Sequence, residues 1–234
     1  MVLAAGMGTR MRPLTDDRCK ALVTVRGRAL IDHVLDRLVQ AGVKRAVVNV
    51  HAFADLLEAH LRKRTDIEIV ISDERAQLME TGGGVRQALP LLGDAPFVVC
   101  NIDSVWEEPA GSAIARLARG YNRETMGARL LLAAMSEQLG YDGAGDFVAE
   151  PDGRIVLRGE RPSAPWAYMG AQIVDPRVVA SEPLEPFSFM RIWKRLISEG
   201  RLYGAPLGGY WMHVGDPGAR AEAEARLAAA APGA

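Results

Sequence analysis

Short apolar runs alternate with segments of helical periodicity over residues 2–101, and this alternation constrains the fold more than any other feature. The apolar runs are 2–5, 46–50, 67–71 and 97–101. Between them, the apolar residues of 29–41, 53–61 and 82–89 recur at the spacing of one helix face. Strands that alternate with helices predict a mainly parallel sheet with helices on both sides.

After about residue 125 the pattern changes to short strands separated by turns. The composition predicts strands at 130–135, 147–150, 154–157, 169–174 and 210–214. A helix is expected over 189–197, and a last one begins at Asp216-Pro217. The second half is therefore expected to extend the sheet with shorter strands.

Composition excludes several classes of protein. The 234 residues carry a formal net charge of −1, without the basic excess of a general nucleic-acid binder. No segment has the roughly 18 continuous apolar residues of a membrane span, and no basic stretch precedes the first apolar run. Cys19 and Cys100 form no CxxC pair, which favours a reduced, cytoplasmic protein. We therefore expect small-molecule substrates, with neither nucleic acid nor membrane as a partner.

The first apolar run ends in a glycine-rich turn with two arginines, LAAGMGTRMRP at 3–13. Small residues let backbone N–H groups approach an anion without an intervening Cβ. Met11 occupies the third glycine position of a dinucleotide-binding loop, and no GxxxxGK[ST] sequence is present. By itself, the turn is either a phosphate-binding loop or an ordinary strand-to-loop connection.

The wider sequence decides between these interpretations. LAAGMGTRMRPLT, followed by Lys20-Ala21-Leu22-Val23, resembles the signature of the sugar-1-phosphate nucleotidyltransferases. The resemblance continues, in the family's order, through ETGGG at 80–84, NID at 101–103 and GERP at 159–162. It implies an α/β, Rossmann-like (glycosyltransferase-A-like) fold, with a mixed, mainly parallel sheet flanked by helices and a small sugar-binding β lobe. The implied reaction converts an NTP and a sugar 1-phosphate into an NDP-sugar and pyrophosphate.

The resemblance also implies a division of the chain and a choice of substrates. One nucleotidyltransferase domain would span 1–231, with a nucleotide-binding half at about 1–125, a sugar-binding half at about 126–215 and a C-terminal helix at 216–231. Residues 232–234 are expected to be a frayed tail. UTP and N-acetylmuramate 1-phosphate are the favoured substrates. Mannose-1-phosphate guanylyltransferase, another hexose-1-phosphate nucleotidyltransferase and a non-catalytic nucleotide-binding relative remain alternatives, and the oligomeric state stays open.

The family's functional residues map onto this chain as three sets. The catalytic set is Arg10, Lys20 and Asp103: the two cations would neutralise the triphosphate, and the carboxylate, which follows the buried run 97–101, would bind Mg²⁺. The nucleotide-binding set is Leu3, Ala4, Ala5, Gly6, Gly8, Thr9, Arg10, Glu80, Thr81, Gly82, Gly83 and Asn101, with the glycines packed against the base. The sugar-phosphate set is Asp146, Phe147, Glu160, Arg161, Tyr168 and Gly170, any of which could equally serve a strand or turn.

His213 is the most consequential departure from the family pattern, which has a second aspartate ligand for the metal there. Imidazole suits Zn, Fe or Ni better than Mg²⁺. Three explanations follow: Asp103 holds the metal with phosphates and water, Asp216 or Asp146 supplies the missing carboxylate, or the enzyme is weak or altered. Asp216 followed by Pro217 is also a good helix start.

Overall fold

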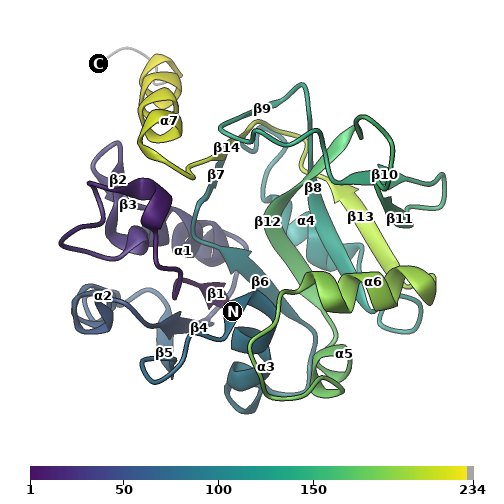
Figure 1. Ribbon diagram of the computed structural model, residues 1–234, viewed down its shortest axis with the longest axis horizontal. Coiled ribbons are helices and arrows are strands. Elements are labelled where there is room, and N and C mark those ends of the chain that lie inside the picture. Colours follow the sequence, from purple (N-terminus) through teal and green to yellow (C-terminus); the bar gives the residue numbers. More distant parts are fainter. Residues whose placement is uncertain (231–234) are drawn as a thin grey trace.

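The four apolar runs of the first half form the parallel part of a mixed sheet (Figure 1). The computed structural model describes residues 1–230. Strands β6, β1, β4 and β5 lie side by side in that order, all parallel. Their bounds are β1 Val2–Leu3, β4 Arg45–Val50, β5 Glu68–Asp73 and β6 Phe97–Asn101. Their carboxyl ends therefore meet at one edge of the sheet.

Side chains on these strands alternate between two apolar cores, one on each face of the sheet. In β4, Val48 and Val50 enter one core and Val47 enters the other. Three helices cover the first face: α1 Leu30–Gln40, α2 Ala54–Leu61 and α4 Ala113–Arg119. Three others cover the second: α3 Glu80–Leu92, α5 Pro176–Ala180 and α6 Met190–Ser198.

The second half continues the same sheet with mixed pairing. Strand β12 runs antiparallel to β6, and the full path is β11-β10-β12-β6-β1-β4-β5. Strand β8 pairs with β12 and carries β13 parallel at its other side. The bounds are β8 Ala128–Ala134, β10 Phe147–Ala149, β11 Ile155–Leu157, β12 Trp166–Val174 and β13 Leu202–Pro206.

Two small sheets and a last helix complete the fold. Strand β14 (Trp211–His213) lies between β7 (Ser104–Trp106) and β9 (Gln138–Leu139), and its register sets His213 opposite Ser104. Strands β2 (Thr24–Val25) and β3 (Arg28–Ala29) form a hairpin, and α7 spans Pro217–Ala229. Single 3-10 turns, η1 (Thr9–Met11) and η2 (Lys20–Leu22), follow the glycine turn. The β7–β14 pairing brings His213 next to Asp103.

The structure confirms the predicted fold class and most of the predicted elements. The run 97–101 is β6 as expected, and the helix predicted at 29–41 is α1. Strand β13 was not predicted, because its sequence LYGAP contains a glycine and a proline that disfavour strands. The predicted end of the last helix at 231 and the tail 232–234 lie outside the described residues. Among residues 1–230, none of the helices is long and apolar enough for a membrane crossing.

Candidate active site

A cavity of about 500 Å³ lies at the carboxyl edge of the parallel strands, beside the ends of β1 and β6. This is the edge at which open α/β sheets bind ligands. The predicted residues that line it are Leu3, Ala5, Gly6, Gly8, Thr9, Arg10, Lys20, Glu80, Thr81, Asn101 and Asp103. Met7, Asn49, Leu78, Ile102, Ser188 and Gly215 also line it and were not predicted. The glycine turn and residues 78–81, about 70 residues apart in sequence, form two facing walls of this cavity, and the ends of other segments complete it.

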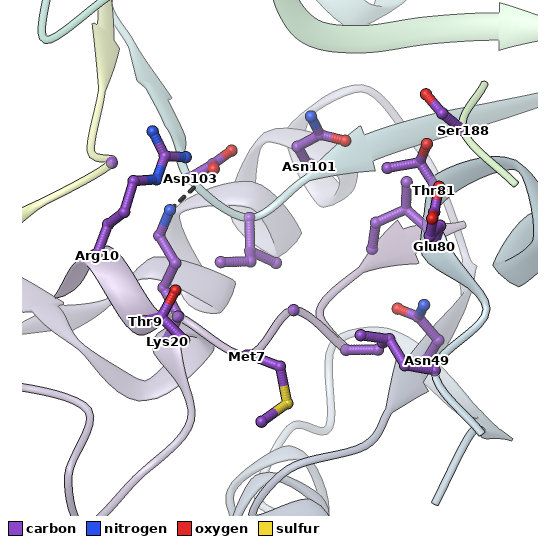
Figure 2. A pocket seen from close by; sticks show the side chains of 17 residues that line it. Met7, Thr9, Arg10, Lys20, Asn49, Glu80, Thr81, Asn101, Asp103 and Ser188 are labelled. Atoms are coloured by element: carbon purple, nitrogen blue, oxygen red, sulfur yellow. Dashed lines mark hydrogen bonds and ion pairs between the residues drawn. The ribbon is translucent and has the colours of Figure 1, made fainter. Parts of the chain in front are cut away.

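The cavity has a strongly charged end and a second end lined mainly by uncharged polar side chains. Figure 2 shows Arg10, Lys20 and Asp103 together at one end. At the other end are Thr81 and Ser188, with Glu80 exposed at the rim. The glycine turn crosses between the two ends. A ligand with an anionic tail and an uncharged head would match this distribution.

The two glycines of the turn have different environments. A Cβ on Gly6 would meet no atom within 4 Å, so this glycine leaves open space in the cavity. Gly8 has φ 62°, and a Cβ there would lie 3.0 Å from the Lys20 Cβ. The Thr15 hydroxyl donates to the Gly8 carbonyl at 2.9 Å. Gly8 therefore lets the turn pack on the segment that carries Lys20, whereas Gly6 leaves room for a ligand.

One oxygen of Asp103 accepts a hydrogen bond from Lys20 and lies close to the His213 ring. Lys20 Nζ lies 2.9 Å from Asp103 Oδ2, and His213 Nε2 lies 3.5 Å from the same oxygen. His213 Nδ1 lies 3.1 Å from the Gly140 carbonyl oxygen, which can only accept, so Nδ1 carries the proton. This hydrogen bond fixes the imidazole with Nε2 facing Asp103.

The Asp103 carboxyl is held in its charged form. Burial on its own would raise the pKa of Asp103, but the neighbouring His213 side chain and the positive charge of Lys20 hold that pKa well below its ordinary value. Mg²⁺ commonly binds one or two carboxylates, with phosphate oxygens and water as the other ligands. Asp103 fits that role if a substrate supplies the phosphates. Within residues 1–230, no group of three or more His, Cys, Asp or Glu side chains is arranged to hold a metal ion. A metal bound at Asp103 would therefore need further ligands from the substrate or water.

The glycine run at the start of α3 packs against protein rather than facing the cavity. The backbone N–H groups of Gly82 and Gly83 donate to the Phe187 carbonyl at 2.8 and 3.1 Å. A Cβ on Gly82 would lie 2.3 Å from the Phe187 ring. Both glycines are buried and do not line the cavity. This corrects the expectation that they pack against a base, and Ala4 is likewise buried below the turn.

Two members of the predicted sugar-phosphate set have structural partners instead. Asp146 accepts from the Tyr141 hydroxyl at 2.7 Å and from the Tyr168 backbone N–H at 2.9 Å, so both of its oxygens are engaged. Phe147 is fully buried, with its ring 5.9 Å from that of Trp193. A side chain in that position cannot contact a sugar, which corrects the prediction for Phe147.

The rest of the sugar-phosphate set does not line the cavity either. Gly170 is buried with φ 87°, and a Cβ on it would lie 2.4 Å from the Ser104 hydroxyl. Tyr168 is half-buried, and its ring contacts Trp193 at 4.7 Å. Glu160 and Arg161 lie in an exposed turn. The cavity therefore brings together the nucleotide-binding predictions but not the sugar-phosphate ones.

Asp216 also has a structural partner. Its Oδ1 accepts from the Ala219 backbone N–H at 3.0 Å, which caps α7. It is absent from the cavity lining. Of the carboxylates suggested as a second metal ligand, Asp216 caps a helix and Asp146 is engaged by two tyrosines. Asp103 and His213 are left facing each other.

Asn49 is the unpredicted cavity residue for which the sequence carries a signal. It interrupts the apolar run AVVNV near the carboxyl end of a buried strand, and it is 2% exposed. A polar residue in such a strand needs a buried hydrogen-bond partner. Leu78 and Ser188 carry no comparable signal, because their position depends on long-range packing.

A parallel sheet with a glycine turn, two cations and a charged carboxylate at its carboxyl edge defines an α/β enzyme that handles phosphate-bearing ligands. The family model described as "Nucleotidyl transferase" matches residues 1–229. The chain therefore belongs to the nucleotidyl transferase family. This confirms the resemblance to the sugar-1-phosphate nucleotidyltransferases drawn from its motifs.

Individual relatives are similar to this chain to different degrees and over different lengths. The N-acetylmuramate alpha-1-phosphate uridylyltransferase of Caulobacter vibrioides is 54% identical, over 98% of this chain and 97% of that protein. The mannose-1-phosphate guanylyltransferase catalytic subunit beta of Danio rerio is 31% identical, over 93% of this chain and 61% of that protein. Among solved structures, the inositol-1-phosphate CTP transferase of T. maritima has a TM-score of 0.79 at 17% identity, covering 99% of this chain and 96% of that one. The last similarity concerns the fold alone.

Proposed function

We propose that this enzyme transfers a uridylyl group from UTP to N-acetylmuramate 1-phosphate, giving UDP-N-acetylmuramate and pyrophosphate. The observation that carries the proposal is the 54% identity to a uridylyltransferase of that name over nearly the whole of both chains. The cavity supports it, because its strongly charged end suits a triphosphate and its second end, with the polar side chains of Thr81 and Ser188, suits a base. We further propose a role in recycling cell-wall sugars and a cytoplasmic location, and the two free, buried cysteines favour that location.

In the proposed mechanism, the triphosphate lies along the glycine turn and the sugar phosphate oxygen attacks the α-phosphorus in line. Arg10 binds phosphate oxygens with its guanidinium fork and stabilises the departing pyrophosphate. Lys20 neutralises charge that builds up in the transition state. Its side chain is only 10% exposed, so its field is weakly screened by water. The transfer depends on positioning and charge neutralisation and needs no covalent enzyme intermediate.

We propose Mg²⁺ as the cofactor, with Asp103 as its protein ligand. Bound there, the ion would supply Lewis-acid charge neutralisation and a template for the phosphates. Of the three explanations for His213, we favour the one in which Asp103, substrate phosphates and water suffice. Asp146 and Asp216 have other hydrogen-bond partners, which disfavours either as the missing ligand. His213 would then help Lys20 to orient the Asp103 carboxylate, since both side chains approach the same oxygen.

The sugar 1-phosphate is proposed to bind on the side of the C-terminal half, as the division near residue 125 suggests. Glu160 and Arg161 are the exposed polar candidates there, and Tyr168, a few residues further along the chain, is a half-buried candidate. Glu160 would accept hydroxyl hydrogens of the sugar, and Arg161 would meet its phosphate. These two side chains are free of the core packing that engages Phe147.

Pyrophosphate release across a panel of four NTPs and several sugar 1-phosphates, with Mg²⁺, tests the proposal. UTP with N-acetylmuramate 1-phosphate is expected to exceed every other pair by about 100-fold, or roughly 2.7 kcal/mol of transition-state discrimination. Fastest turnover with GTP and mannose 1-phosphate would instead support the guanylyltransferase alternative, which the 31% identity to such an enzyme motivates. Nucleotide binding without pyrophosphate release from any pair would support a non-catalytic relative.

A further inference from the structure

Three buried hydrogen bonds connect the two walls of the cavity. The Ala4 backbone N–H donates to Asn49 Oδ1 at 2.6 Å, and Asn49 Nδ2 donates to Glu74 Oε1 at 2.7 Å. The Met79 backbone N–H then donates to Glu74 Oε2 at 3.0 Å. Asn49 is 2% exposed and Glu74 1% exposed. We call the set Ala4, Asn49, Glu74 and Met79 the Asn49–Glu74 bridge.

Each end of the bridge holds a segment that lines the cavity. Ala4 directly precedes Ala5 and Gly6, where the glycine turn begins. Met79 directly precedes Glu80, whose φ of 60° is in the left-handed region that a non-glycine residue rarely adopts. Such a conformation persists only where its surroundings hold it. The bridge therefore anchors both the start of the turn and the strained entrance to α3.

The third glycine of the run at 82–84 makes room for the bridge. A Cβ on Gly84 would lie 2.7 Å from Glu74 Oε1 and 3.1 Å from Asn49 Nδ2. Glycine weakens the interior of a helix relative to alanine, so its presence in α3 needs a local reason. The buried carboxylate also lies at the amino end of α3, where the helix dipole favours a negative charge. Gly84 and the helix end thus accommodate a carboxylate that would otherwise be costly to bury.

We propose that Asn49 and Glu74 are positioning residues for the nucleotide, holding the glycine turn and the entrance to α3 at a fixed separation. The proposal rests on the proposed function, in which one ligand contacts both walls. A nucleotide that meets two preset walls does not have to order them on binding. Without the bridge, the hydrogen bonds through Asn49 and Glu74 no longer set the separation of the two walls, and nucleotide affinity falls.

The hydrogen-bond polarity of the bridge provides a sharp test. Both backbone ends are donors, so the two side chains must present an acceptor at each end and one donor between them. Asn49→Asp alone brings two carboxylate oxygens together in the middle. Glu74→Gln alone sets an amide N–H against another donor at one of its two contacts. The double variant Asn49→Asp/Glu74→Gln moves the central donor from one residue to the other and keeps all three hydrogen bonds.

Calorimetric titration with UTP and Mg²⁺, without sugar phosphate and well below the unfolding temperature, measures the effect. Each single variant is expected to raise the Kd for UTP about tenfold, the typical effect of an unmade buried hydrogen bond. The double variant is expected to return within about threefold of wild type. In turnover, the KM for UTP should rise in the single variants while the KM for the sugar phosphate stays unchanged.

Asp175→Asn is the matched control. Asp175 is a fully buried carboxylate bonded to Arg123 and Arg177, and it follows the end of β12 that pairs with Phe97, at the opposite edge of the sheet. This variant should lower the Tm and leave the Kd for UTP unchanged. Single bridge variants that lower the Tm but keep the wild-type Kd would overturn the proposal, since that is the result of a merely structural role.

The other possible results of these titrations also support or overturn the proposal. If a single variant does not fold, the double variant decides alone: wild-type affinity supports the proposal, and weaker affinity or failure to fold overturns it. If wild type binds another NTP instead of UTP, the same titrations with that NTP test the bridge. Binding without pyrophosphate release would sink the proposed function while the bridge is still decided by Kd. If no NTP binds wild type, both proposals fall.

Discussion

The two halves of the sheet use their polar side chains for different purposes. At the carboxyl edge of the parallel strands, Arg10, Lys20 and Asp103 face a common cavity. In the antiparallel half, both carboxylate oxygens of Asp146 accept hydrogen bonds from protein groups, and Gly170 packs closely against Ser104. The first half gathers its conspicuous residues around a cavity, whereas in the second half Asp146 and Gly170 hold strands and loops together.

Topology explains this difference. Parallel strands all end at one edge, so a turn after β1 and a carboxylate after β6 must lie near each other. Antiparallel strands send successive loops to opposite edges, so sequence order alone does not say which loops face the ligand. Motif positions in the first half therefore locate a site, whereas in the second half they locate only turns and strands.

Among the variants that test this difference between the two halves, Asp103→Asn is expected to have the largest effect on activity. The variant keeps the volume of the side chain and removes the charge that Lys20 and His213 face. We expect pyrophosphate release to fall about 1,000-fold, the upper range for loss of one electrostatic group in an active site. The control is Asp216→Asn, because asparagine caps a helix as well as aspartate does. Equal losses in both variants would restore Asp216 as a metal ligand and contradict the assignment to Asp103 alone.

Phe147→Ala tests the other half. Phe147 is fully buried against Trp193, so its removal leaves a cavity in the core. The free energy of unfolding should fall by about 3 kcal/mol, as is usual for a buried aromatic side chain. Urea denaturation measures this, and turnover per folded molecule should stay within about twofold of wild type. Lost turnover at unchanged stability would return Phe147 to the sugar site.

The residues at the charged end of the cavity were predicted from the family resemblance, whose motifs are short and continuous in the sequence. LAAGMGTR begins with a short strand that ends in a glycine turn, and Asp103 lies two residues after the end of β6. The packing partner of Gly82 and Gly83 was not predictable, because a glycine run indicates close packing but not the group against which it packs. Their partner is Phe187, about 100 residues away, and its approach depends on the long-range packing of α3 against α5 and α6.

Arg10→Ala should lower kcat/KM for UTP about 100-fold, or roughly 2.7 kcal/mol, through loss of phosphate contacts and pyrophosphate stabilisation. Arg12→Ala is the matched control two residues away. Its side chain is 71% exposed and lies 3.6 Å from Asp16, the geometry of a surface ion pair. Such pairs are worth about 0–1 kcal/mol, so the control should change kcat/KM less than about fivefold. A larger effect at Arg12 would extend the phosphate site along the turn.

The smallest expected effect is at Arg161, the one cation of the predicted sugar-phosphate set. Arg161 is exposed and donates to the Arg158 carbonyl at 3.1 Å. Arg161→Ala should raise the KM for the sugar phosphate about fivefold, roughly 1 kcal/mol for an exposed charge, and leave the KM for UTP unchanged. Arg154→Ala, at an exposed ion pair with Asp152 in the same half, should change neither.

Steady-state kinetics at varied sugar phosphate separates the two outcomes. A rise specific to Arg161 would show that the antiparallel half contributes an exposed charge to the reaction after all. No change would mean that Arg161 does not contact the sugar phosphate, and the charge of that phosphate would then have to be met by Arg10 and Lys20 from the parallel half.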